Sequence, residues 1–270
     1  MVAMFQKKYF QWYRLMHTEN KNIYYILPAL NEADNLDKLF LSFVNFYNHK
    51  RENIIIIYVN DGSTDNTIEK LEKIKIGLPN NISLKILNHK TNQGLGIALS
   101  NGFKKCFLLA KDEDVLITMD TDNSHTIEQS YQLYKKIYEQ KSDIVIASRY
   151  RRNSKISGLN KTRIVLSFIA AILFKIFFNI KNVRDYTCGF RAYRVDKVRK
   201  IIQNYKNFFS ETGFSVSADI LLKLSKYKKN LIFNEIPIDL RYDLKEGASK
   251  MKIFKTIYLN LKLIIQRKIN

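Results

Sequence analysis

Short apolar runs recur along the first 150 residues and alternate with stretches in which apolar positions are three or four residues apart. Nearly continuous runs of this length are typical of strands in a parallel sheet that is covered on both sides. The intervening stretches have the spacing of amphipathic helices, as with Leu36, Leu39 and Phe43 after the first run. The predicted strands are residues 23–30, 54–59, 82–87, 115–119 and 143–147.

This alternation predicts an α/β fold with an open, mostly parallel, Rossmann-like sheet and helices on both faces. We assign it to one domain over residues 23–250, because no repeat or low-complexity tract interrupts the pattern. Residues 1–22 form a basic and aromatic segment before this domain, and residues 251–270 form a basic amphipathic helix after it.

Two segments beyond the alternating region have a different pattern. Residues 164–180 are strongly apolar and contain one charged residue, Lys175. As a helix they would extend roughly 26 Å, which is short for a membrane crossing. Residues 251–269 place apolar side chains along one helical stripe with lysines and arginines beside it. We expect both segments to be interface helices on a membrane surface, with core packing or a dimer face as the alternative.

The formal net charge of +20 is concentrated in these later segments. Residues 149–200 contain 14 Lys and Arg against 2 Asp, which gives +12, and residues 241–270 contain 8 against 2, which gives +6. Such localisation predicts contact with polyanions, namely phosphates, anionic lipid or nucleic acid. A solvated, solubilising surface is the alternative.

Composition narrows the class of protein. With 46% hydrophobic residues, 3 Pro and 9 Gly, the chain is neither disordered nor fibrous. Cys106 and Cys188 are far apart and belong to no metal-binding motif, which favours a reduced, cytosolic protein. The start of the sequence lacks the apolar run of a signal peptide. We therefore expect a peripheral protein on the cytoplasmic face of a membrane.

The strongest local signal is the pair Asp120 and Asp122, which follows a predicted strand. Residues two apart on an extended segment project to the same side, so both carboxylates converge on one point. A divalent cation removes their mutual repulsion, and Mg²⁺ takes one or two carboxylates together with substrate phosphate oxygens. Open α/β sheets bind ligands at this edge, so we expect Mg²⁺ or Mn²⁺ there.

Acidic residues follow two other predicted strands. Asp61 follows the strand at 54–59, and Asn31 and Glu32 follow the strand at 23–30. Asp65 is as well suited to capping the next helix as to binding a ligand. Three acidic strand ends in one half-domain favour a shared pocket for a nucleotide and a metal.

In combination these segments resemble the family 2 glycosyltransferases with a GT-A fold. The matching segments are PALNE at 28–32, NDGSTD at 60–65, NQGLG at 92–96 and MDTD at 119–122. The resemblance implies a nucleotide-sugar donor, GDP- or UDP-linked. It also implies that Asp120 and Asp122 hold the metal and the diphosphate. The implied donor-site residues are Pro28, Asn31, Glu32, Asp61, Asp65 and Gly94.

Later segments look like dolichol-phosphate mannose synthase and its bacterial polyprenyl-phosphate relatives. They are ASRY at 147–150, Arg163, TCGFRAY at 187–193 and GASKM at 247–251. The resemblance implies that Arg149 and Arg163 bind the phosphate of a polyprenyl acceptor and act with Asp122 in catalysis. By analogy Arg241, Ser249 and Lys250 lie near donor or acceptor phosphate.

The sequence departs from the family at several positions. Ser124 stands where a glutamine often contributes a metal ligand, so the third metal contact is open. His125 could be a ligand, although a hydrogen-bonded loop histidine is commoner. Arg191 could belong to the phosphate site or pair with Asp185.

We therefore predict an inverting transferase that moves a sugar to a polyprenyl phosphate. Such an acceptor is already ionised and needs no general base, and no convincing base is visible. A family 2 enzyme acting on a hydroxyl is the alternative, with Glu211 and Asp219 as its residual base candidates. A basic nucleic-acid-binding protein is disfavoured, because acidic strand ends repel a phosphate backbone.

Overall fold

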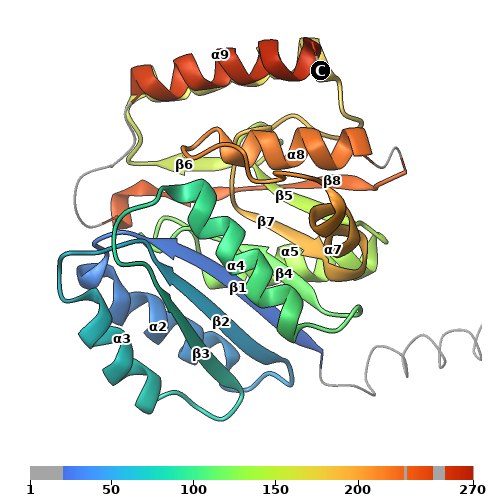
Figure 1. The fold of residues 1–270 in the computed structure, drawn as a ribbon. Helices are drawn as coiled ribbons and strands as arrows, with labels where there is room; N and C mark the ends of the chain where they lie inside the picture. The colour runs from blue at the N-terminus through green and yellow to red at the C-terminus, as the bar shows by residue number, and fades with distance from the viewer. Residues whose placement is uncertain (1–20, 228–229, 246–252, 270) are drawn as a thin grey trace, which may run out of the picture.

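A seven-stranded mixed sheet forms the centre of the computed structural model, which describes residues 21–227, 230–245 and 253–269 (Figure 1). The strand order is β3-β2-β1-β4-β7-β5-β8. Strand β7 runs antiparallel to both of its neighbours, and the other neighbouring pairs are parallel. The strands are β1 (Asn22–Ala29), β2 (Asn53–Asn60), β3 (Ile82–Asn88), β4 (Val115–Thr118), β5 (Ile144–Ser148), β7 (Arg191–Arg194) and β8 (Phe233–Pro237).

Helices cover both faces of this sheet. Helix α4 packs against β1 and β2, while α5 lies against β5 and β7 and also contacts α2 (Figure 1). The sheet residues between these layers are almost wholly buried, which is why their sequence is continuously apolar. The helices are α2 (Ala33–Tyr47), α3 (Thr67–Ile76), α4 (Leu95–Leu109), α5 (Ile127–Glu139), α7 (Val195–Asn204) and α8 (Val216–Tyr227).

The remaining elements form a layer beyond the sheet. Strands β6 (Lys155–Ser157) and β9 (Asp239–Arg241) pair in parallel, and η1 (Tyr242–Leu244) follows. Helices α6 (Lys161–Phe178) and α9 (Ile253–Ile269) contact each other, with α9 at the top of Figure 1. Among the described residues, no helix combines the length and apolarity that a membrane crossing requires.

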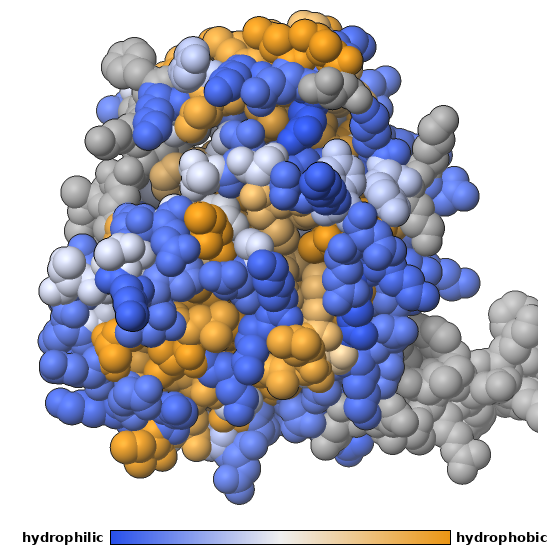
Figure 2. Space-filling view, in the orientation of Figure 1, coloured by the Kyte–Doolittle hydropathy of each residue, from blue (hydrophilic) through white to orange (hydrophobic). Residues whose placement is uncertain are grey.

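Each of these two helices carries an exposed apolar stripe. The exposed residues recur at intervals of three or four, so they lie along one side of each helix. Hydrophobic residues gather over α9 at the top of Figure 2. The α6 stripe is Val165, Phe168, Ile169, Ile172 and Ile176, and the α9 stripe is Tyr258, Leu261, Ile265 and Ile269.

All five predicted strands are observed to within two residues, and the α/β fold is confirmed. The helix predicted over 164–180 begins three residues earlier, because Asn160 caps it by accepting a 3.0 Å hydrogen bond from the Thr162 amide. The pattern did not predict β6 to β9. Membrane contact stays a prediction, as do the domain bounds. Residues 1–20 of the basic-aromatic segment lie outside the described residues.

Candidate active site

The parallel strands β1, β2, β4 and β5 end at one edge of the sheet, where a pocket of about 470 Å³ opens. This is the edge at which open α/β sheets bind ligands. The pocket brings together eight of the residues predicted from the sequence. They are Pro28, Glu32, Asp61, Gly94, Asp120, Asp122, Arg149 and Arg163.

Asp61 is buried at the end of β2 and organises the loop before α4. Its carboxylate accepts hydrogen bonds from the amides of Gln93 at 2.9 Å and Gly94 at 2.8 Å. Nδ1 of His89 lies 2.7 Å from the same carboxylate, while Nε2 lies 2.9 Å from Asn101. Asp61 therefore fixes the pocket wall while lining the pocket itself.

Asn31 and Asp65 tie neighbouring loops together and do not line the pocket. The Asn31 side chain accepts a 2.7 Å hydrogen bond from the amide of Thr64. Asp65 accepts hydrogen bonds from the amides of Ala33 and Thr67, each at 3.2 Å, at the starts of α2 and α3. Asp65 thus has the capping role that its position also allowed.

The glycines before α4 permit a close approach of two backbones. Gly94 has φ +91°, in the region that favours glycine. A Cβ on Gly96 would lie 1.7 Å from the carbonyl oxygen of Glu211, so no side chain fits there. The loop carrying Glu211 is therefore pressed against the start of α4, beside the pocket residues Thr212 and Gly213.

The two carboxylates after β4 differ in their surroundings. Asp120 faces the open space of the pocket, and desolvation followed by repulsion from Asp122 raises its pKa to about 7. Asp122 is buried, and its carboxylate accepts hydrogen bonds from the Ser124 hydroxyl at 2.5 Å and from the Lys245 ammonium at 2.5 Å. Although burial acts to raise it, Lys245 lowers the pKa of Asp122.

A divalent cation fits this carboxylate pair. A positive charge already lies against Asp122, since the Lys245 ammonium is bound there. Ser124 turns its hydroxyl to Asp122 and orients that carboxylate. The described residues contain no group of three or more His, Cys, Asp or Glu side chains that could hold a metal. Asp120 and Asp122 would therefore be the protein ligands, and substrate phosphate oxygens would complete the set, as is usual for Mg²⁺.

His125 closes the pocket behind this pair. Its ring stacks on Phe190 with centroids 4.4 Å apart, and it is 8% exposed. Desolvation lowers its pKa to about 4, so the ring is neutral at pH 7. Within the described part of the chain, its Nδ1 atom is buried and has no hydrogen-bond partner.

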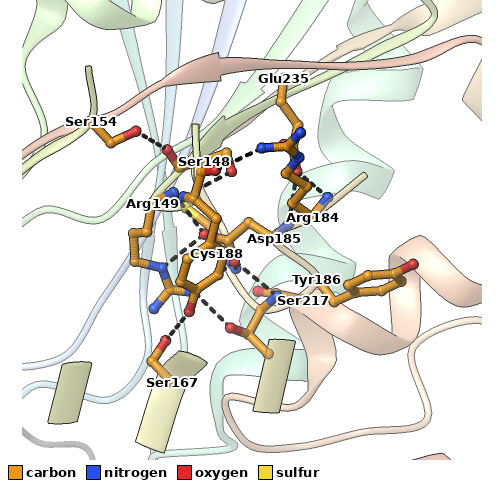
Figure 3. Close-up of polar contacts among 12 residues, drawn as sticks. Ser148, Arg149, Ser154, Ser167, Arg184, Asp185, Tyr186, Cys188, Ser217 and Glu235 are labelled. Atoms are coloured by element: carbon orange, nitrogen blue, oxygen red, sulfur yellow. Dashed lines mark hydrogen bonds and ion pairs between the residues drawn. The ribbon is translucent and has the colours of Figure 1, made fainter. Parts of the chain in front are cut away.

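Arg149 follows β5, and its guanidinium pairs with the buried carboxylate of Asp185 (Figure 3). Asp185 accepts hydrogen bonds from its Nε at 2.8 Å and its Nη2 at 2.6 Å, and Thr187 accepts another from Nη2 at 2.6 Å. Glu235 in turn accepts a 2.7 Å hydrogen bond from the Asp185 amide. A fixed guanidinium of this kind suits a phosphate or carboxylate ligand.

The far side of the pocket is built by the two helices with apolar stripes. Arg163, Leu166 and Ala170 line it from α6, and Ile257 and Asn260 line it from α9. Each helix therefore has one side on the pocket and an apolar side exposed.

Residues 24–202, more than half of the chain, match the family described as glycosyl transferase family 2. The chain belongs to this family. It is 31% identical over 240 residues to a dolichol-phosphate mannosyltransferase of Pyrococcus furiosus, covering 88% of this chain and 61% of that protein. It is 28% identical to a UDP-N-acetylglucosamine–dolichyl-phosphate N-acetylglucosaminyltransferase of Methanococcus voltae, covering 90% of this chain and 96% of the relative.

Solved structures show the same fold. Glucosyl-3-phosphoglycerate synthase of Mycobacterium tuberculosis, in complex with Mn²⁺, UDP and glucosyl-3-phosphoglycerate, superposes with a TM-score of 0.63. The sequence identity is 15%, over 92% of this chain and 80% of that one. The mixed sheet and the family match confirm the expected GT-A fold.

Other residues predicted for this family 2 glycosyltransferase lie elsewhere. Arg241 is outside the pocket lining, where its guanidinium pairs with Asp243 at 2.7 Å. Ser249 and Lys250 lie outside the described residues. The suggested pairing of Arg191 with Asp185 is wrong, because Arg191 is wholly buried and donates to the carbonyls of Ser217 at 2.6 Å and Tyr186 at 2.8 Å.

Neither base candidate lines the pocket. Glu211 accepts a 2.9 Å hydrogen bond from the Ser215 hydroxyl. Asp219 is fully buried and pairs with Lys223 and with Arg267 of α9, each at 2.6 Å. Lys245 is a charged pocket residue that sequence reasoning missed, and Tyr242 and Asn260 also line the pocket without having been predicted. A lone lysine in a basic loop carries no periodic signal that would single it out.

Proposed function

We propose that this chain transfers a sugar, with inversion, from a nucleotide-diphosphate sugar to a polyprenyl phosphate at a membrane surface. The observation that carries the proposal is the order of chemistry along one pocket. Acidic residues at the ends of β1, β2 and β4 lie at one side and Arg149 follows. Helices α6 and α9 complete the pocket with the apolar side chains of Leu166, Ala170 and Ile257 among polar ones. This order matches a charged donor, an anionic acceptor group and a lipid chain.

At the donor side, Pro28, Glu32 and Asp61 would hold the nucleoside, and Asp120 and Asp122 would hold Mg²⁺ or Mn²⁺ with the diphosphate. The bound ion would supply Lewis acidity for the charge that develops on the leaving phosphate. The Mycobacterium tuberculosis structure with Mn²⁺ and UDP supports this arrangement. The donor is GDP- or UDP-linked in this proposal.

At the acceptor side, Arg149 and Arg163 would bind and aim the phosphate. Because a phosphate monoester is largely ionised at pH 7, it attacks without transferring a proton to the enzyme. The positions of Glu211 and Asp219 outside the pocket lining support this choice over a hydroxyl acceptor. The dolichyl- and undecaprenyl-phosphate enzymes among the relatives support it as well.

The two apolar stripes would contact the membrane. Lys255 and Lys262 are exposed on α9 beside its stripe, where they would meet anionic lipid headgroups. Because the other sides of α6 and α9 line the pocket, the lipid acceptor would pass between pocket and bilayer beside these helices. We place the enzyme on the cytoplasmic face, where the buried thiols of Cys106 and Cys188 would stay reduced.

The test is transfer of radiolabel from a panel of GDP- and UDP-sugars to a short polyprenyl phosphate, with Mg²⁺, with Mn²⁺ and with chelator. We expect metal-dependent label in the organic phase, lost in Asp122→Ala and Arg149→Ala. Lys90→Met, which removes an exposed charge outside the pocket lining, is the control and should keep full activity. Transfer to a sugar hydroxyl, with none to the lipid phosphate, would overturn the acceptor and leave the family intact.

A further inference from the structure

Lys245 forms a buried ion pair with one of the two carboxylates that follow β4. Its Nζ lies 2.5 Å from Oδ2 of Asp122, and the two side chains are 14% and 9% exposed. Surface ion pairs contribute little, but a pair this enclosed is held in one geometry. The lysine therefore occupies a defined place in the pocket, which it also lines.

The backbone holds Lys245 in this place. Arg241 donates its amide to the carbonyl of Ser124 at 2.9 Å, which joins the segment after β9 to the loop that carries Asp122. The Lys245 amide donates to the carbonyl of Tyr242 at 3.3 Å, and its ammonium lies 5.9 Å from the centre of the Tyr242 ring. These three contacts together bring the lysine to the carboxylate.

An ammonium and a divalent cation compete for such an oxygen. Both require direct contact with the carboxylate, and like charges within a few ångströms repel strongly at any dielectric constant found in proteins. Asp120, in contrast, makes no ion pair with a cation among the described contacts, whereas Asp122 does. One ammonium therefore lies beside a pair of carboxylates.

We propose that Lys245 is an internal counter-ion, which occupies the cation position on Asp122 in the metal-free enzyme and leaves it for the diphosphate when metal and nucleotide bind together. The proposal rests on the proposed function, in which Asp120 and Asp122 hold the metal. It explains how the buried carboxylate of Asp122 stays charged next to Asp120 between turnovers. It also makes free metal a weak ligand and the metal–nucleotide complex a strong one, because only the complex offers the ammonium a new anionic partner.

The experiment is a titration with Mn²⁺, followed by the electron paramagnetic resonance of the free ion, without nucleotide and then with UDP or GDP. The proteins are wild type, Lys245→Met, Lys245→Arg and the charge control Lys90→Met. In Lys245→Met we expect free Mn²⁺ to bind at least about tenfold more tightly, because the competing charge is removed. We expect Lys245→Arg and Lys90→Met to stay within about twofold of wild type, since neither removes the charge at Asp122.

The nucleotide arm tests the second half of the proposal. Nucleotide should strengthen Mn²⁺ binding to the wild type by a larger factor than to Lys245→Met, which has no ammonium to move. Equal affinity of wild type and Lys245→Met for free Mn²⁺ would overturn the proposal, and so would an equal gain with nucleotide. Thermal unfolding shows whether each variant is folded. If Lys245→Met does not fold, Lys245→Arg, which retains the positive charge, is the variant to compare with the wild type.

Failure of the proposed function gives a different result. If Asp122→Ala binds Mn²⁺ as the wild type does, with and without nucleotide, the assignment of the metal ligands is wrong, and the counter-ion role falls with it. If Asp122→Ala loses Mn²⁺ while Lys245→Met leaves the affinity unchanged, the metal site stands and Lys245 has only a structural role.

Discussion

The fully buried carboxylate of Asp185 accepts two hydrogen bonds from the guanidinium of Arg149, from Nε at 2.8 Å and from Nη2 at 2.6 Å. Glu235 holds the Asp185 amide from the other side. Such bidentate pairs fix direction as well as position. Arg149 is therefore held in a fixed orientation, and that orientation depends on Asp185, which does not line the pocket.

Replacing Asp185 by asparagine should leave Arg149 largely buried without its counter-charge. We expect a loss of about 2–4 kcal/mol in the free energy of unfolding, measured with urea. We also expect the KM for the acceptor to rise about tenfold or more, with little change in donor affinity, because the Arg149 guanidinium would no longer be oriented toward the acceptor phosphate. Asp196→Asn, which breaks a half-exposed pair with Arg194, is the control and should cost under about 1 kcal/mol. Equal effects of the two variants would contradict this reading.

Charges on the apolar stripes should release the protein from membranes. Ile172→Glu on α6 and Ile265→Glu on α9 place a carboxylate on residues that are 42% and 60% exposed. We expect the double variant to bind vesicles of anionic lipid at least about tenfold more weakly, through lost burial and added repulsion. Activity on a short, water-soluble acceptor should persist. Ile76→Glu, at an 87% exposed position on α3, should bind vesicles as the wild type does.

Gly96→Ala should disturb the pocket through a backbone clash. The added Cβ would meet the Glu211 carbonyl at 1.7 Å, and neither backbone can give way without moving α4 or the 211–213 loop. We expect at least about 2–3 kcal/mol of destabilisation, together with weaker nucleotide binding. Gly77→Ala is matched in chemistry, but its nearest neighbour would lie 3.8 Å away, so it should change stability by less than about 1 kcal/mol. The free energy of unfolding of both variants is measured with urea, and equal losses in the two would contradict the prediction.

Arg267→Gln should loosen α9. The arginine is one of two cations on buried Asp219, and it also donates to the Ser210 hydroxyl at 3.0 Å. Losing a charged hydrogen bond of this kind should cost about 1.5–3 kcal/mol. Limited proteolysis should then cut within α9 sooner than in the wild type. The prediction fails if Lys262→Gln, an exposed change on the same helix, has the same effect.

The parallel half of the fold could be predicted because strands buried on both faces appear in the sequence as nearly continuous apolar runs. Residues 54–59 of strand β2 are four isoleucines, a tyrosine and a valine, and the strand ends just before Asp61. The acidic strand ends could be predicted for the same reason, since chemistry at the end of a buried strand stands out against its apolar neighbours. Glu32, Asp61, Asp120 and Asp122 follow strands in this way, and the family resemblance supplied the other four of the eight predicted residues that line the pocket.

The antiparallel insertion could not be predicted in this way. Strand β7 has four residues and includes the buried Arg191, whose guanidinium donates to the main-chain carbonyls of Tyr186, five residues away, and Ser217, 26 residues away. Lys245 was missed for a related reason. Its contact with Asp122 joins residues 123 positions apart, and only the fold brings them together.

Strand β7 also sets a length. Asp120 and Asp122 follow β4, Arg149 follows β5, and β7 separates these two strands. Neighbouring strands lie 4.7–4.9 Å apart, so the two groups start about 10 Å from each other along the sheet. Main-chain hydrogen bonds between the strands set this distance, so it does not depend on which side chains the strands carry. If the proposed roles hold, the residues that meet the sugar could vary among transferases with this strand order, while the backbone would keep the proposed metal site and the proposed acceptor-phosphate site at one distance.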